Sequence, residues 1–198
     1  NVITYWFFTY LEKDRGYDSN SILFTMAPAI LVLAVGYFVG GALGDYFFKK
    51  TPSGRLIVST IGVLVGALFL YLTMRVPLDQ PTAFMILLML TALFMPFASP
   101  NVISTVYDVS LPEVRSTALA VESFIESAGA ALAPLIAGII ADALSLKDAI
   151  LIICISTWIL CGFLFIFATR LVPHDIQVLR GQLRERAEHE RASQGVQG

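Results

Sequence analysis

Long uncharged runs, separated by short polar segments, make up most of this sequence. Each of five runs is about as long as the 20 or so apolar residues that a helix needs to cross a bilayer. Apart from charged residues close to the ends of the runs, only the fourth contains any, Glu122 and Glu126. The pattern predicts five membrane-spanning helices, at about residues 22–45, 56–75, 82–107, 116–143 and 149–170.

A sixth apolar run, residues 1–11, is half as long as a crossing. It is either the end of a helix whose beginning precedes Asn1, or a short interfacial segment with Tyr5, Trp6 and Tyr10 in an aromatic belt. We favour the truncated helix, because the polar loop at residues 12–20 follows directly, as it does after a complete crossing.

The composition excludes a water-soluble domain. Hydrophobic residues make up 57% of the chain and charged residues 14%, against about 25% charged in an ordinary soluble domain. A net charge of −2 gives no indication of a nucleic-acid partner. Neither His174 and His189 nor Cys154 and Cys161 have the spacing of metal ligands, so we expect no cofactor and no metal.

Basic residues predict the orientation, because cytoplasmic loops carry an excess of Lys and Arg. Alternate loops, taken with the C-terminal tail, divide the thirteen basic residues nine to four. The larger set predicts that the loop around Gly54, the loop around Pro112 and the tail lie in the cytoplasm. The smaller set comprises Lys13, Arg15, Arg75 and Lys147.

The loop between the first two full crossings resembles the signature loop of the major facilitator superfamily, G-x-L-x-D followed by a basic cluster. The matching residues are Gly41, Leu43, Asp45, Lys49, Lys50, Gly54 and Arg55. Tyr46 departs from the pattern, because the family usually has Arg there. The stretch that begins at Pro112, with Glu113 and Arg115, resembles the P-E-x-R turn that opens a long helix in the same family.

This resemblance implies an all-α, polytopic membrane helix bundle, namely the C-terminal half of a twelve-helix transporter (helices seven to twelve, the first one truncated). The partners that it implies are a small-molecule substrate, the lipid bilayer and the N-terminal half of the same chain. The resemblance also implies a conformational latch formed by the signature-loop residues. In the family the Asp, here Asp45, contacts a helix N-terminus of the opposite half, where exposed N–H groups favour an anion.

Arg115 would face the signature loop of the other half, and Gly41, Lys49, Lys50 and Arg55 complete the predicted latch. The alternative for Asp45 is a solvated carboxylate at the end of a helix.

Small residues recur on the first full helix at Gly36, Gly40 and Gly44, and residues four apart share a helix face. Such a ridge lets another helix approach closely. It serves either static packing or, by resemblance, sliding between the two halves.

In the third full helix, Pro96 and Pro100 each remove a backbone hydrogen bond. Asn101 beside them is either a substrate contact or an interhelical hydrogen-bonding group. Tyr5 and Trp6 are candidates for the same cavity, with packing or belt roles as alternatives.

Glu122 and Glu126 share one helix face and lie about 9 Å and 15 Å along the helix from Ser116, which puts Glu126 near the middle of the membrane. A carboxylate there costs about 2.5–3.5 kcal/mol. Glu126 is therefore either a protonated carboxyl used in proton coupling or paired with a base of the other half. Glu122, the shallower residue, can also reach the membrane surface.

After residue 171 the composition becomes polar. Ile176, Leu179 and Leu183 predict an amphipathic cytoplasmic tail at residues 172–198. The sequence as a whole predicts a secondary active transporter of the cell membrane that moves a small solute by alternating access, coupled to protons or another ion. A non-transporting scaffold or sensor is the first alternative. A membrane-embedded enzyme is a weaker one, because no nucleophile, base or metal ligands converge at one depth.

Overall fold

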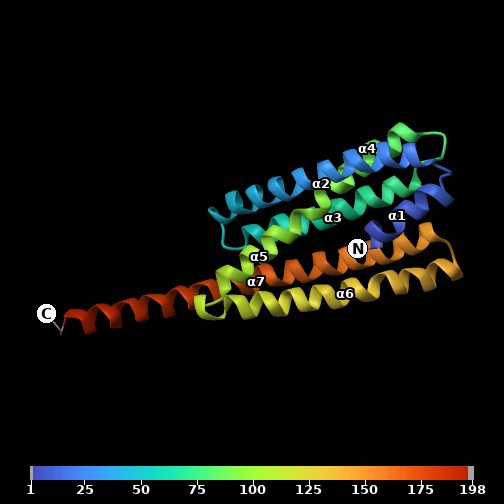
Figure 1. Ribbon diagram of the computed structural model, residues 1–198. Helices are drawn as coiled ribbons and strands as arrows, with labels where there is room; N and C mark the ends of the chain where they lie inside the picture. The colour runs from blue at the N-terminus through green and yellow to red at the C-terminus, as the bar shows by residue number, and fades with distance from the viewer. Residues whose placement is uncertain (1, 196–198) are drawn as a thin grey trace.

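The computed structural model describes the backbone of residues 2–195, and the exposure and contacts of the side chains of residues 6–189 and 191. Within residues 2–195 it contains helices and no strand (Figure 1). Five helical segments are long and apolar enough to cross a membrane, which confirms the predicted all-α membrane bundle. The elements are α1 (Val2–Lys13), α2 (Ser19–Phe48), α3 (Gly54–Arg75), α4 (Pro81–Phe94), η1 (Met95–Phe97), α5 (Ala98–Val109), η2 (Pro112–Val114), α6 (Arg115–Ala143) and α7 (Leu146–Gly195).

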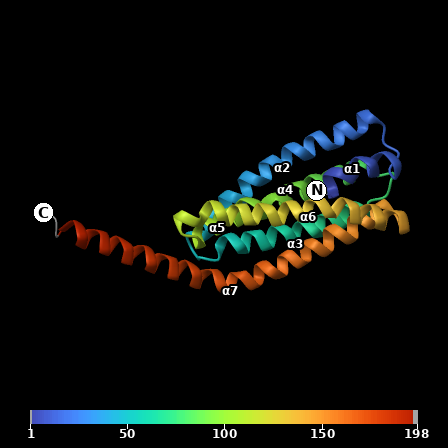
Figure 2. The same cartoon turned by 60° about the horizontal axis from the view of Figure 1, so that its bottom comes forward.

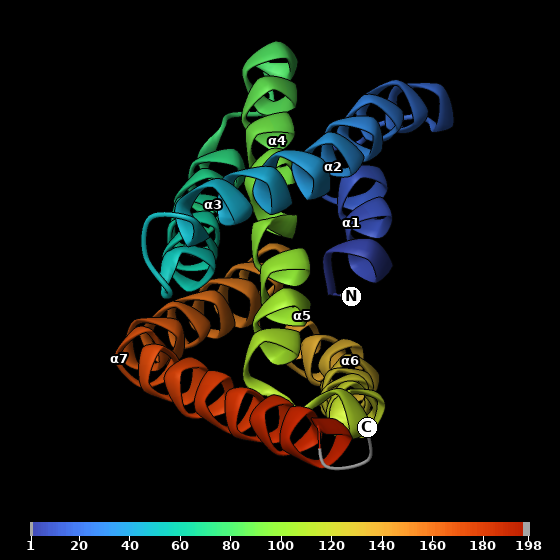
Figure 3. The ribbon, with the colours of Figure 1, turned by 90° about the vertical axis from the view of Figure 1, so that its left-hand side faces the viewer.

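The third crossing is a broken helix. Pro96 and Pro100 lack the N–H groups that a continuous helix would use, and the chain passes from α4 through the 3₁₀ segment η1 into α5. Viewed along the bundle in Figure 3, α4 and α5 follow one another across α2, and α5 ends beside α6 and α7.

Glycines of two helices hold this break in place. A Cβ atom on Gly40 of α2 would lie 2.7 Å from the Cα of Phe97, and one on Gly62 of α3 would lie 2.4 Å from the Cβ of Phe97. Phe97 is therefore enclosed between two helices at positions where only glycine leaves room for it.

Helix α3 packs most extensively, against α2, α4, α5 and α7, whereas α6 contacts mainly α1, α5 and α7. The largest hydrophobic cluster joins α1, α3, α4 and α7, with Phe7, Leu70, Phe84 and Ile150 fully buried. Of the described residues of α6, only Ala137 is buried, so most of the surface of this helix has no partner within the chain.

Arg15 lies at the end of the bundle that carries the α1–α2 and α3–α4 turns, and it is only 7% exposed. Its guanidinium donates hydrogen bonds to the carbonyl oxygens of Val76 (3.2 Å) and Pro77 (3.1 Å). It also lies over the ring of Phe84, 3.9 Å from the centroid. Arg15 thus connects the α1–α2 turn to the α3–α4 turn.

At the start of α2, the carboxylate of Asp18 accepts a hydrogen bond from the N–H of Ser21 (3.2 Å) and caps the helix. Hydrogen bonds from the side chain and N–H of Ser21 lower the pKa of Asp18.

Helix α7 does not end where the apolar run ends. It continues through Pro173, and in Figures 1 and 2 its orange-to-red C-terminal part extends beyond the bundle. Ile176 and Leu179 on this part are buried, whereas Leu183 is 36% exposed. Near it, Arg186 donates a 2.7 Å hydrogen bond to Glu113 of η2.

Candidate functional site

The predicted signature loop is the turn between α2 and α3, at the end of the bundle that also carries the α5–α6 turn. We call this the signature end. The N–H of Lys49 donates to the carbonyl of Asp45 (3.2 Å), and the N–H of Thr51 to that of Phe47 (2.9 Å), so the last turn of α2 closes tightly. Gly54 follows, and a Cβ atom on it would lie 2.3 Å from the carbonyl carbon of Phe47. The turn is therefore compact because residue 54 is glycine.

The side chain of Arg55, in the first turn of α3, joins two acids. It donates to Asp45 Oδ1 from Nη2 (2.8 Å) and Nε (3.2 Å), and its Nη1 forms an ion pair with Asp108 at the end of α5. We call these three residues the Arg55 cluster. It links three helices, α2, α3 and α5, through a single guanidinium.

Burial differs within the Arg55 cluster. The side chains of Arg55 and Asp108 are 15% and 25% exposed, whereas that of Asp45 is 62% exposed. The ring of Phe48 covers Arg55, with 4.1 Å between the guanidinium carbon and the ring centroid. Two carboxylates share one cation, so the cluster carries a net negative charge, and Asp45 is open to a further donor from outside the chain.

The α2–α3 turn is also attached to α7. The buried hydroxyl of Ser53 donates a 2.6 Å hydrogen bond to the carbonyl of Thr169. Leu56 of α3 packs with Val172 and Ile176 of α7 in a second, smaller hydrophobic cluster. The signature end is therefore held by four helices.

The structure unites only part of the predicted latch. Asp45 and Arg55 meet, but Lys50 lies over the ring of Tyr46, 4.3 Å from its centroid. Arg115 donates a 3.3 Å hydrogen bond to the carbonyl of Ser110. The remaining two members are Lys49, whose side chain is exposed, and Gly41, which lies on α2 facing Pro100.

Sequence reasoning missed Asp108 and Phe48 as members of this site. Asp108 carried a usable signal, since it is an acid at the end of an otherwise uncharged run, as Asp45 is. The position of Phe48 gives no such indication, because an aromatic residue at a helix end is common in any membrane protein.

Asn101 lies in a helix contact and not in a cavity. It is 1% exposed, and its amide donates to the carbonyls of Gly40 (3.0 Å) and Phe97 (2.7 Å). A Cβ atom on Gly44 would lie 1.6 Å from Asn101 Oδ1. The geometry thus favours interhelical hydrogen bonding, the second of the two roles considered for Asn101.

The glycine ridge of α2 also has its partner within the chain. Its three glycines face η1 and the adjoining ends of α4 and α5, and a Cβ atom on Gly36 would lie 2.3 Å from the carbonyl oxygen of Leu93. The geometry therefore favours static packing, the first of the two roles considered for this ridge, over a sliding surface toward another half. This ridge is occupied by the broken helix, because only a surface without side chains admits it so closely.

Of the two aromatic candidates on α1, Trp6 is partly buried and donates from Nε1 to the carbonyl of Pro134 (3.1 Å). This contact joins α1 to the C-terminal half of α6. The side chain of Tyr5 lies outside the described side chains.

Glu122 and Glu126 lie on α6, as predicted, in a shallow hollow with Ala118, Val121 and Ile125. Glu122 accepts a 3.4 Å hydrogen bond from Ser123. Among the described residues, neither acid forms an ion pair. No group of three or more potential metal-ligating side chains occurs in the described part of the chain.

A comparison with known protein families identifies the family of this chain. A model of the major facilitator superfamily matches residues 1–192. The chain belongs to the major facilitator superfamily. No individual curated protein matches it. Members of this family are membrane transporters that sit in the lipid bilayer and bind small-molecule substrates, and are typically not enzymes. This facilitator chain is therefore an integral membrane protein of the transporter class.

Proposed function

We propose that this chain is the C-terminal half of a secondary active transporter that moves a small solute by alternating access. In this proposal the Arg55 cluster is a conformational latch at the cytoplasmic face of the cell membrane. The single observation that carries the proposal is the exposure of the Asp45 side chain. It is held in place by Arg55 and yet 62% exposed at the side chain, as a group that contacts a second half would be.

The geometry explains why the latch would act on more than one helix. Arg55 joins the ends of α2, α3 and α5, so any force on Asp45 is transmitted to all three. When a helix N-terminus of the other half contacts Asp45, its N–H groups stabilise the carboxylate. Loss of that contact favours the inward-facing state.

The surface of α6 supports the second part of the proposal. This helix is mostly unpartnered and carries Glu122 and Glu126 without ion pairs among the described residues. We infer that this surface faces the other half across the transport cavity. Glu126 then binds a proton or a base of the other half, which offsets the cost of a charge at that depth.

The latch can be tested without knowing the solute. In the full-length transporter with its other cysteines replaced, Ser127→Cys places a thiol beside Glu126 on the exposed surface of α6. Asp45→Asn removes a charge but keeps the size of the side chain. It is expected to raise several-fold the rate at which a membrane-impermeant maleimide labels this introduced thiol from the cytoplasmic side.

Asp79→Asn is the matched control, because Asp79 is an exposed acid in the α3–α4 turn. It should leave the labelling rate unchanged. Equal rates for the parent and the Asp45→Asn transporter, at equal membrane abundance, would exclude the latch.

A further inference from the structure

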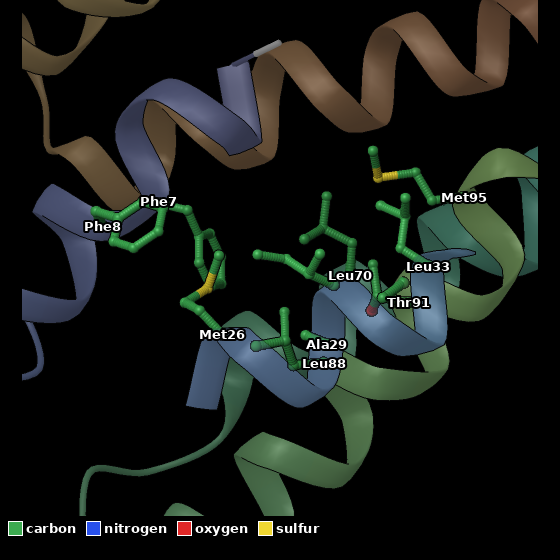
Figure 4. A pocket seen from close by; sticks show the side chains of 11 residues that line it. Phe7, Phe8, Met26, Ala29, Leu33, Leu70, Leu88, Thr91 and Met95 are labelled. Atoms are coloured by element: carbon green, nitrogen blue, oxygen red, sulfur yellow. The ribbon is translucent and has the colours of Figure 1, made fainter. Parts of the chain in front are cut away.

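An apolar cavity that is open on one side lies between α1, α2, α3 and α4, apart from the Arg55 cluster. Its volume is about 110 Å³. Figure 4 shows Phe7 of α1, Met26 and Leu33 of α2, Leu70 of α3, and Leu88 and Met95 around it. Met95 belongs to η1, so the cavity lies directly beside the break in the third crossing.

The one polar side chain among its described lining residues is already satisfied. Thr91 Oγ1 donates to the carbonyl of Leu87 (2.9 Å) and lies 3.3 Å from Thr73 Oγ1. A polar or charged ligand entering here would lose its hydration and find no free hydrogen-bond donor on these walls. Sugars, peptides and ions are therefore unsuited to this cavity.

The walls suit an apolar ring. Phe7 is stacked on Phe84 behind it, with centroids 6.3 Å apart, which fixes one wall. Met26 and Met95 provide flexible, polarisable walls that adapt to different shapes. An engineered cavity of about 150 Å³ lined by similar residues in another protein binds benzene and remains dry when empty. The present cavity is slightly smaller.

The cavity has an approach from the surface of the bundle. Two of its lining residues, Phe8 and Ile30, are 43% and 55% exposed. They belong to α1 and α2, two neighbouring helices that are otherwise joined by the α1–α2 turn. The gap between these two helices is therefore the route by which an apolar molecule would enter the cavity.

We propose that this cavity is a binding site for a small, uncharged, apolar molecule about the size of benzene. This site is separate from the latch, and its occupancy does not depend on whether the chain transports anything. Binding needs only the volume of the cavity, its apolar walls and the approach at Phe8 and Ile30.

Four of the five methionines provide the test. The full chain is labelled with ¹³C-methyl methionine, placed in lipid nanodiscs and titrated with benzene. We expect saturable ring-current shifts at Met26 and Met95, which line the cavity. Met85 and Met89, partly buried on α4 away from its walls, should show only the linear drift caused by benzene in the lipid. Linear drift at all four methyl groups would overturn the proposal.

Two variants make the test specific. Ala29→Leu fills the cavity from α2 and should abolish the saturable shifts, whereas Ala42→Leu, on an exposed position of the same helix, should leave them intact. Leu88→Ala enlarges the cavity and should let para-xylene produce the saturable shift that benzene produces in the parent. Saturable shifts that are identical in the Ala29→Leu chain would place the benzene elsewhere and refute the assignment.

Discussion

At the residue scale, neighbouring glycines on α2 have different roles. Gly40 faces Phe97, and a Cβ atom there would lie 2.7 Å from its Cα. Gly41 is one residue further along, and its Cβ atom would lie 3.6 Å from the Cβ of Pro100, an ordinary contact distance. The close approach of the broken helix therefore depends on Gly40 and not on Gly41.

This difference predicts opposite outcomes for two alanine substitutions. Gly40→Ala forces Phe97 or the backbone of η1 to shift, and overpacking of this kind costs about 1–3 kcal/mol. Gly41→Ala replaces a helical glycine where there is room, so stability should be equal or slightly higher. Thermal unfolding in nanodiscs measures both. A melting temperature for Gly40→Ala at or above that of Gly41→Ala would contradict the packing described here.

Residue chemistry also shows where sequence reasoning succeeded at the site. Asp45 and Arg55 could be singled out because charges are rare in this chain and both fall in a recognisable loop. Their pairing could not be predicted from spacing alone. It requires the tight turn that Gly54 permits, which brings the first turn of α3 back against the last turn of α2.

At the element scale, the run-length pattern correctly predicted five helices that are long and apolar enough to cross a membrane, because bilayer thickness and helix rise together fix the length of a spanning helix. Two features could not be read from it. One is the continuation of α7 through Pro173, since a proline inside a run indicates a bend or an end without distinguishing them. The other is the burial of Arg15, because an arginine in a short polar loop gives no sign of being enclosed.

The contact of Arg15 provides a test at this scale. Its guanidinium binds two carbonyls and lies on a ring, a combination that lysine cannot reproduce because it lacks the planar fork. Arg15→Lys should therefore destabilise the bundle by about 1–3 kcal/mol.

Arg75→Lys is the appropriate comparison, because Arg75 is an exposed arginine at the end of α3. It should unfold within about 0.5 kcal/mol of the parent, as surface substitutions usually do. Equal denaturant midpoints for Arg15→Lys and Arg75→Lys would show that the Arg15 contact does not hold the two turns together.

At the scale of the whole molecule, burial is uneven. Helix α3 is enclosed by its neighbours, whereas α6 is mostly unpartnered and carries Glu122 and Glu126, neither of which forms an ion pair among the described residues. The sequence indicated that Glu122 and Glu126 share a face, but not that so few residues of α6 are covered by the other helices. That required knowing which helices pack together, which run length does not specify. Such a surface is expected where two halves of a facilitator enclose a solute pathway.

The most direct test of alternating access is two-sided labelling of the Ser127→Cys transporter in oriented vesicles, with the signature loop otherwise unchanged. An impermeant maleimide should label the introduced thiol both from the cytoplasmic side in inside-out vesicles and from the outer side in right-side-out vesicles, because the surface of α6 is exposed to each side in turn. Labelling from one side only, or from neither, in protein that is folded and correctly inserted would contradict this account.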